Sequence, residues 1–459
     1  MREAGTAIEA GKAARERLPL AAVGDFKPGT DRSDPIELLE RQGQTRVWDL
    51  LPIRYGRMLL SPFSFYRGAA AVMSSDLARS DDSGLRVQLC GDAHVANFGG
   101  FASAERALVF DINDFDETVP GPWEWDLKRL VASLEIAGRQ NGFSTAKRER
   151  IVRAAAGAYR SAMRDFARLP FLEVWYQQLN VRGILSRWRS SLDARSGRRL
   201  ATAHRRGKDN QRAIERLTHT VDNELRFVST PPLVQRLDDL MPADEAAMFK
   251  RETNGYLDAY RASLSNDRRA VLDRFIVGDI ARKVVGIGSV GTRTNIALLL
   301  GQAPNEHLVL QIKEAQRSVL EPFAGRSEYE HSGRRVVEGQ RLMQASADIL
   351  LGWARGPGID GVVRDYYIRQ MWDSKISPDI DRMSSRVLRT MGKACAWTLA
   401  RAHARSGDRV AISTYLGKGR AFADAISRFA VAYADQNERD YKALVAAVDQ
   451  GRIVARRGV

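Results

Sequence analysis

Three polar residues carry the chemistry that this sequence suggests. Asp92 and Asn97 lie five positions apart across a loop that begins at Gly91, and Asp114 follows the next apolar run. One carboxylate of this set can accept a proton, while a second carboxylate and an amide oxygen can hold a hard cation such as Mg²⁺. Metal-assisted phosphoryl transfer needs these groups, because it depends mainly on positioning and on the neutralisation of charge.

The spacing of the polar residues, more than their types, favours a functional site. Asp, Asn and Gly are common in turns, so any one of them alone is best explained as a turn residue. Here Gly-Asp-x-His-x-x-Asn is followed by an apolar stretch that ends in Asp-Phe-Asp. We expect short strands over residues 85–89 and 108–112 to deliver the polar side chains. Asp111 is the alternative to Asp114 if the second strand is shifted in register.

The same strings resemble known families. The pattern is similar to the catalytic and metal loops of kinase-like phosphotransferases, closest to aminoglycoside and choline kinases, which use Gly-Asp-x-x-x-x-Asn followed by Asp-Phe or Asp-Trp. The longer strings GDAHVANFG, FDINDFDET and GPWEWDLKRL resemble a bacterial family, domain of unknown function 2252, which is grouped with the kinase-like superfamily. This likeness runs over most of the chain.

The resemblance implies a role for each polar residue of the first site. Asp92 would orient and deprotonate an acceptor hydroxyl, and Asn97 and Asp114 would bind the metal ion. Asp126, at the start of a helix after the turn at 119–122, would support the catalytic-loop backbone through hydrogen bonds. The alternative for Asp126 is an acidic residue that only the helix dipole favours.

A second motif follows much later in the chain, where Gly286, Gly288, Ser289 and Gly291 form a G-x-G-x-x-G pattern. In a dinucleotide-binding fold the last glycine opens a helix, whereas in a kinase the glycines bend an antiparallel hairpin over the phosphates. The next apolar run follows within about ten residues, which is too short for a crossover helix. Lys313 stands where the dinucleotide fold needs an acidic residue. We therefore predict the hairpin.

Lys313 is expected to hold the phosphates of a nucleotide and to need a carboxylate partner. By resemblance this partner is Glu338, on a helix expected over residues 332–347. Glu330 and Glu328 are alternatives, because periodicity leaves the register of the helix open. An acidic residue on an amphipathic helix is otherwise expected to face solvent.

The order of these motifs is inverted relative to a standard kinase, in which the glycine-rich loop comes first. Here Asp114 precedes Lys313 by 199 positions. The helix expected over residues 387–405 would then be the one that normally precedes the catalytic loop, and Met371 would lie in the linker between lobes. We expect the charged groups of Lys313 and Asp114 to face one cleft, roughly 4 to 10 Å apart.

We therefore predict an α+β, protein-kinase-like, two-lobed fold with a circularly permuted order of motifs. Permutation is tolerated where the chain ends lie at the surface. The predicted parts are an N-terminal arm and helix (1–50), a helical lobe with the catalytic loop (51–270), a nucleotide-binding sheet lobe (271–380) and helices that return to the helical lobe (381–459).

Length and composition agree with a soluble protein of more than one lobe. The chain has 459 residues, of which 44% are hydrophobic and 28% charged. Its two cysteines, Cys90 and Cys395, lie in apolar surroundings, which indicates a reducing compartment and no disulfide. No run is long enough to cross a bilayer, and residues 1–17 do not form a secretory signal. We expect a cytoplasmic location and no membrane partner.

The net charge of +15 is unevenly distributed. Residues 181–226 hold twelve Arg or Lys against five Asp or Glu. Their spacing is helical, and the aromatic residues within or beside the segment are sparse, namely Trp188 and Phe227, so we expect a solvated helical face and no nucleic-acid partner.

Two further stretches, residues 54–58 and 63–69, mix arginines with aromatic residues. They either line an anion site or pack their aromatic rings while the arginines reach past them to solvent.

The predicted function is phosphoryl transfer that depends on ATP and Mg²⁺. Many of the protein kinases that the pattern resembles have a Lys in this loop, whereas no Lys lies between Asp92 and Asn97. We therefore expect the acceptor to be a hydroxyl of a small molecule. His403 is expected to be a packed or capping residue. The alternatives are transfer of AMP to a protein on the same fold, a nucleotide-binding regulatory module without turnover, and a nucleic-acid binder that uses the basic segment.

Overall fold

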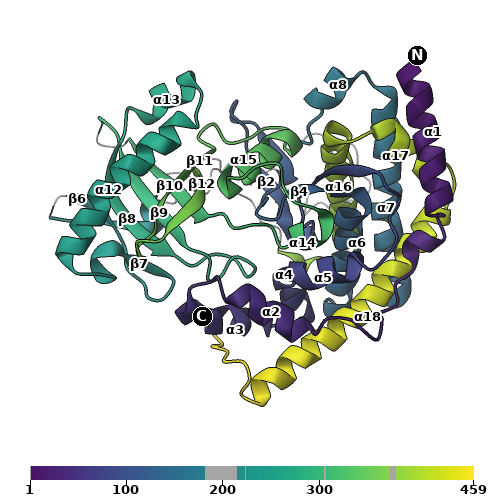
Figure 1. The fold of residues 1–459 in the computed structure, drawn as a ribbon, viewed down its shortest axis with the longest axis horizontal. Helices are drawn as coiled ribbons and strands as arrows, with labels where there is room; N and C mark the ends of the chain where they lie inside the picture. Colours follow the sequence, from purple (N-terminus) through teal and green to yellow (C-terminus); the bar gives the residue numbers. More distant parts are fainter. Residues whose placement is uncertain (1, 181–213, 223, 304–305, 372–378) are drawn as a thin grey trace.

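The chain combines a six-stranded antiparallel sheet with a larger helical part, as the computed structural model shows (Figure 1). The α+β class is therefore confirmed. The residues that the structure describes are 2–180, 214–222, 224–303, 306–371 and 379–459.

The sheet has the strand order β11-β12-β10-β9-β8-β7, and all neighbours are antiparallel. Its buried face includes Leu299, Leu310 and Ile368, which pack against Tyr260 of helix α12. The bounds are β7 Val234–Arg236, β8 Ile276–Lys283, β9 Thr294–Leu300, β10 His307–Glu314, β11 Gly352–Pro357, β12 Val363–Gln370 and α12 Ala243–Ala262.

The glycine-rich segment forms the connection between two antiparallel strands, β8 and β9. Gly286 and Gly291 have φ angles of 67° and 88°, in the left-handed region that glycine adopts without a steric penalty. Strand β9 begins at Thr294, and no helix of the described part begins at Gly291. The predicted hairpin is confirmed, and the helix start of a dinucleotide-binding fold is excluded.

The sheet begins earlier in the chain than the predicted boundary at residue 271. Strand β7 pairs with β8, and α12 packs on β11, although both lie within the range 51–270 that we assigned to the helical lobe. Val234 and Leu237 are buried against the sheet, so their apolar side chains account for the difference.

The helical part draws on both ends of the chain, and its core contains the large apolar cluster around Trp123, which stacks on Tyr159 at 5.4 Å between ring centroids. Four apolar residues follow the turn at 119–122 at helical spacing, and all of them are fully buried: Leu127, Leu130, Val131 and Leu134. The long helices are α6 Trp123–Gln140, α7 Thr145–Arg168, α16 Ser385–Ser406 and α18 Ala421–Asp449.

The N-terminal arm contains a helix, α1 (Arg2–Arg17), which packs along α17 (Arg409–Leu416). Their backbones approach so closely that a Cβ at Gly11 would lie 2.4 Å from the carbonyl oxygen of Ala411. An arm was predicted here because the stretch is mostly polar. Its small residues and the buried Leu18 nevertheless form a stripe that fits the helical core.

Four short helices, labelled α2 to α5 in the lower half of Figure 1, join the sheet to the helical part. Val47, just before α3, donates a backbone hydrogen bond to the carbonyl of Gly291 at 2.7 Å and so fastens these helices to the glycine-rich loop. Their bounds are α2 Pro35–Gly43, α3 Leu51–Met58, α4 Pro62–Gly68 and α5 Ala70–Leu77.

Two small ladders carry the first motif. Strands β1 (Arg86–Leu89) and β3 (Leu108–Ile112) match the two predicted strands, and each has its own antiparallel partner. The partner strands are β4 (Val119–Pro122) and β2 (Phe98–Ala102).

Several other expectations have outcomes in the fold. Cys90 and Cys395 are both buried and free, so no disulfide joins them. Within the described ranges, no helix is long and apolar enough to span a bilayer. The first part of the basic segment, residues 181–213, lies outside the described residues. The helical interpretation is wrong for its end, where Thr218–Val221 and Glu224–Phe227 pair as strands β5 and β6.

Candidate active site

Two cavities lie between the sheet and the helical part and share part of their walls. The larger, about 470 Å³, is lined by strands β8, β10 and β12, and the smaller, about 440 Å³, lies against α4 and the loop after β1. Four residues line both cavities: Asn113, Asp114, Gly286 and Ser289. Among the other predicted site residues, Lys313 and Met371 line the larger cavity, whereas Asp92, Asn97 and Gly288 line the smaller.

The loop that carries Asp92 is held by Asp126, the first-turn acid of helix α6. Its carboxylate accepts hydrogen bonds from the backbone N–H of Cys90 at 2.8 Å and of Gly91 at 3.0 Å. The predicted support of the loop backbone by Asp126 is therefore confirmed. His403 is fully buried between Asp126 and Tyr159, so the packing role expected for His403 is also confirmed.

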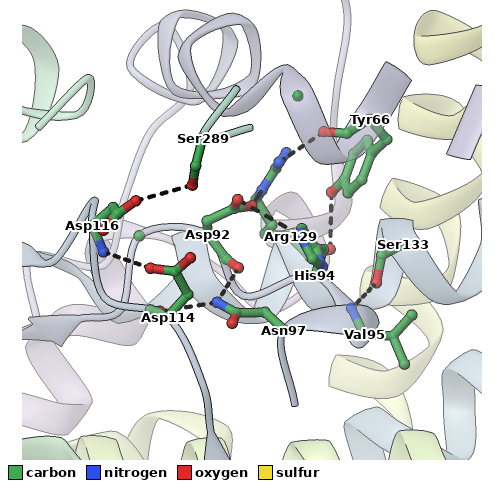
Figure 2. Close-up of polar contacts among 12 residues, drawn as sticks. Tyr66, Asp92, His94, Val95, Asn97, Asp114, Asp116, Arg129, Ser133 and Ser289 are labelled. Carbon is green, nitrogen blue, oxygen red and sulfur yellow. Dashed lines mark hydrogen bonds and ion pairs between the residues drawn. The ribbon is translucent and has the colours of Figure 1, made fainter. Parts of the chain in front are cut away.

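The side chain of Asp92 is oriented by an arginine that the sequence analysis missed (Figure 2). Arg129 on α6 donates from Nε to Oδ1 of Asp92 at 2.6 Å and from Nη2 to the carbonyl of Tyr66 at 2.8 Å. Arg129 follows Asp126 by three positions, a spacing that places both on one face of a helix. This spacing was the feature of the sequence that could have identified Arg129, because both residues belong to the string GPWEWDLKRL.

His94 lies beside Asp92, with its Nε2 atom 3.6 Å from Oδ2 of Asp92. Burial lowers the pKa of His94 to about 4, against the opposing effect of Asp92. The imidazole is therefore neutral near pH 7. The loop between Asp92 and Asn97 consequently brings no positive charge to the site.

Asn97 and Asp114 lie next to each other and could hold a divalent cation (Figure 2). The Nδ2 atom of Asn97 donates to the carbonyls of Asp92 and Asp114, at 2.9 and 3.0 Å, so its amide oxygen remains for another ligand. Asp114 is 39% exposed at the junction of the cavities. Within the described ranges, no group of three or more His, Cys, Asp or Glu is arranged as a metal cage. The donor set fits Mg²⁺, which takes one or two protein ligands together with substrate phosphates.

Asp111, the alternative metal ligand, has a different environment. Its carboxylate accepts two hydrogen bonds from Nη2 of Arg401 on α16, at 2.6 and 2.8 Å, and both side chains are 1% exposed. Asp111 therefore fastens β3 to α16 inside the core, which leaves Asp114 as the accessible carboxylate.

Lys313 lies opposite Asp114, as the sequence analysis expected. Its Nζ atom is 3.5 Å from Oδ2 of Asp114, slightly closer than the expected range, although 199 positions separate the two residues. The second partner of Lys313 is Asp116, which forms a shorter ion pair with it. Burial opposes the positive charge of Lys313, but the two carboxylates outweigh this effect and raise its pKa.

Asp116 connects three parts of the site and was not predicted. Besides Lys313, it accepts hydrogen bonds from the hydroxyl of Tyr367 at 2.7 Å and from Oγ of Ser289 at 3.3 Å. Burial and the nearby charge of Asp114 raise the pKa of Asp116. The repeated acid of the Asp-Phe-Asp string was the signal for this residue, since Lys313 required a carboxylate.

The predicted pairing of Lys313 with Glu338 is wrong in this structure. Helix α15 (Ser332–Met343) presents Gly339 to the loop after β3 so closely that a Cβ there would lie 2.5 Å from Thr118. That register turns Glu338 away from Lys313, and Glu338 lies 3.4 Å from Arg341 instead. Neither Glu338 nor Gly291 lines the two cavities of the described part.

Two arginines of the helical part donate hydrogen bonds to backbone carbonyls of the glycine-rich loop. Arg57 donates to the carbonyl of Gly286 at 2.6 Å, and Arg46 donates to that of Val290. Together with the bond from Val47 to Gly291, these contacts hold the loop against the short helices. At the loop tip, a Cβ on Gly288 would lie 3.2 Å from the carbonyl oxygen of Arg67.

The chain belongs to a bacterial protein family. The model of that family, described as "Uncharacterized protein conserved in bacteria (DUF2252)", matches residues 46–447. The matched range includes every predicted site residue and, apart from Gln42, every residue that lines the two cavities. No curated protein and no solved structure matches the chain.

Proposed function

We propose that this protein is a phosphotransferase that uses ATP and Mg²⁺ and transfers the terminal phosphoryl group to a hydroxyl of a small molecule. One observation carries the proposal. Lys313 and Asp114 come from distant parts of the chain, yet they face each other where the two cavities join, beneath the glycine-rich loop. Asp92 lies in the second cavity, on the acceptor side of that junction.

The larger cavity is the proposed nucleotide site. Lys313 would bind the phosphates, Met371 would contact the base, and the loop from Gly286 to Gly291 would cover the phosphates. Asn97 and Asp114 would hold Mg²⁺, which neutralises charge on the phosphates in this class of reaction. Asp116 would hold Lys313 in place, the role that a glutamate on the helix has in related kinases.

The smaller cavity is the proposed acceptor site. Asp92 accepts the proton of the acceptor hydroxyl, whose oxygen forms a bond to the terminal phosphorus of ATP. The bond from that phosphorus to the bridging oxygen breaks, and ADP leaves with the electron pair. Arg129 keeps the carboxylate of Asp92 oriented toward the acceptor through the 2.6 Å hydrogen bond.

The position of helix α16 supports a permuted kinase-like, two-lobed fold. Its last residue, Ser406, accepts a hydrogen bond at 3.1 Å from the backbone N–H of Gln88 in β1, the strand that leads to Asp92. The helix therefore ends beside the start of the catalytic loop, as it would if a direct connection had been cut and the chain ends moved elsewhere.

A thermal-shift titration with nucleotides tests the proposal most directly. ATP with Mg²⁺ should stabilise the protein by about 2.7 kcal/mol at one hundred times its dissociation constant, and ATP with EDTA should stabilise it much less. The mass of a labelled product then separates phosphoryl transfer from AMP transfer. Absence of stabilisation by any nucleotide at millimolar concentration would refute the nucleotide site.

A further inference from the structure

Three arginines gather at one wall of the smaller cavity, and two of them come from the stretches 54–58 and 63–69, which mix arginines with aromatic residues. They are Arg46, Arg54 and Arg67. Arg46 and Arg54 are 8% and 0% exposed, and Arg46 and Arg67 line the cavity. Arg54 lies behind them and donates from Nη2 to Gln42 and to the carbonyl of Gly68, two residues of the same wall.

None of these three guanidinium groups forms an ion pair with a carboxylate of the described residues. The hydrogen bonds that Arg46 and Arg54 make go to neutral oxygens. The Nε atoms of all three, and Nη1 of Arg54, are buried without a hydrogen-bond partner in the described part of the chain. Positive charge removed from water without a counterion is costly, so an arrangement of this kind favours an anion nearby.

Arg67 is the member of the cluster best placed to meet a ligand. It is only partly buried and lines the cavity, and its guanidinium makes no hydrogen bond or ion pair with the described residues. Burial lowers the pKa of Arg67 and outweighs the carboxylates that act on its charge, which are Asp92 and Asp381. These acids have other partners, because Asp92 accepts from Arg129 and Asp381 accepts from Gln140 at 2.7 Å.

The other acids of the cavity also have partners. Glu314 lies 3.4 Å from Arg293, and Asp116 pairs with Lys313. Glu117 accepts a hydrogen bond from the backbone N–H of Val319 at 2.8 Å, and burial raises its pKa. Glu117, Asp116 and Glu314 act on Arg46 only at longer range, so the arginine cluster is the part of this wall that forms no ion pair with a described residue.

We propose that the acceptor carries an anionic group, a phosphate or a carboxylate, which Arg67 binds, while Arg46 and Arg54 supply positive potential behind it. The proposal rests on the proposed function only in naming this molecule the acceptor. The acceptor class is then a small hydroxyl compound with an acidic group. Its hydroxyl points to Asp92 and its anionic group to the wall formed by α4, since Arg67 and Asp92 line the same cavity.

The test is a titration with inorganic phosphate and with malonate, at constant ionic strength, followed by melting temperature and calorimetry. Either anion should stabilise the wild type, and Arg67→Gln should bind it about tenfold more weakly or worse, because a charge-assisted hydrogen bond is lost. Arg67→Lys keeps the charge and should be intermediate. Since the guanidinium of Arg67 makes no hydrogen bond or ion pair with the described residues, the ligand-free melting temperature of Arg67→Gln should stay near that of the wild type.

Two matched variants identify the site. Arg317 also lines the cavity but is exposed, so Arg317→Gln removes the same charge and should bind anions like the wild type. Lys313→Gln should keep the part of phosphate binding that depends on Arg67, since any phosphate bound by Lys313 belongs to the nucleotide side. Unchanged anion binding in Arg67→Gln, no binding by the wild type, or loss of the Arg67-dependent binding in Lys313→Gln would each overturn the acceptor-anion site.

The nucleotide titration separates this inference from the proposed function. Arg67→Gln should retain stabilisation by ATP with Mg²⁺. If the wild type binds phosphate through Arg67 but no nucleotide, the phosphotransferase proposal fails and the anion site stands. If Arg67→Gln loses nucleotide and phosphate together, Arg67 serves the transferred phosphoryl group and the acceptor-anion site is refuted.

Discussion

Replacing Asp116 by asparagine should disturb both the stability of the protein and its binding of nucleotide. The change keeps the shape of the side chain but removes the closer of the two carboxylates that hold Lys313, whose side chain is 2% exposed. Loss of one partner from a buried ion pair costs about 3–5 kcal/mol when nothing replaces it. Because Asp114 remains 3.5 Å away, we expect a smaller loss, about 1–3 kcal/mol.

The second effect of Asp116→Asn concerns the metal site. With Asp116 neutral, Lys313 should turn further toward Asp114 and compete there with Mg²⁺. The affinity for ATP with Mg²⁺ should fall by about tenfold, which corresponds to about 1.4 kcal/mol. Urea unfolding measures the stability, and calorimetry with ATP and Mg²⁺ measures the affinity.

Glu338→Gln is the matched control, since it removes the same charge from the residue that the sequence favoured. Glu338 lies near Arg341 on a half-exposed face, where an ion pair is worth about 0–1 kcal/mol. We expect little change in stability and none in nucleotide affinity. Equal effects of the two variants would refute the role of Asp116, and loss of nucleotide only in Glu338→Gln would restore the pairing with the helix.

Asp114→Asn should abolish the Mg²⁺-dependent part of the nucleotide thermal shift while the ligand-free melting temperature stays nearly unchanged; a large loss of ligand-free stability would instead mean a structural carboxylate. Asp92→Asn should lose turnover and keep ATP affinity by calorimetry, and parallel loss of both would move Asp92 to the metal site. His94 binds its proton more weakly in the folded state, with a pKa of about 4 against an ordinary 6.5. The free energy of unfolding is therefore highest above pH 6.5, and through His94 it declines by roughly 3 kcal/mol as the pH falls toward 4. Urea unfolding from pH 7 to 4 should therefore give a flatter profile for His94→Gln than for the wild type, and identical profiles would contradict the burial argument.

Local spacing was enough to predict which polar groups of the loop from Gly91 to Asn97 lie near Asp114. Asp92 and Asn97 are close in the chain, and the strand before Asp114 has a clear apolar pattern, so their neighbourhood follows from short-range geometry. The glycine-rich hairpin was predictable for the same reason, because the interval before the next apolar run excluded a helix.

Contacts between distant segments were harder to predict. Lys313 had carboxylate candidates both in the string that ends at Asp116 and on the helix that carries Glu338, and helical periodicity does not reveal how a helix is rotated against its sheet. The close approach of Gly339 to Thr118 sets that rotation, and it depends on tertiary packing. The hydrogen bond from Arg57 to Gly286 of the glycine-rich loop likewise joins segments 229 positions apart.

The hydrogen bonds to the carbonyls of the glycine-rich loop also affect how fast a nucleotide could enter and leave. Three hydrogen bonds hold the carbonyls of Gly286, Val290 and Gly291, and each contributes about 0.5–1.5 kcal/mol. If a nucleotide enters beneath the loop, the open state would be populated from roughly a tenth down to below a thousandth of the time. Its association rate constant would then be the diffusional value multiplied by that fraction, and ADP would leave through the same rare opening, so the helical part would set the residence time of the nucleotide.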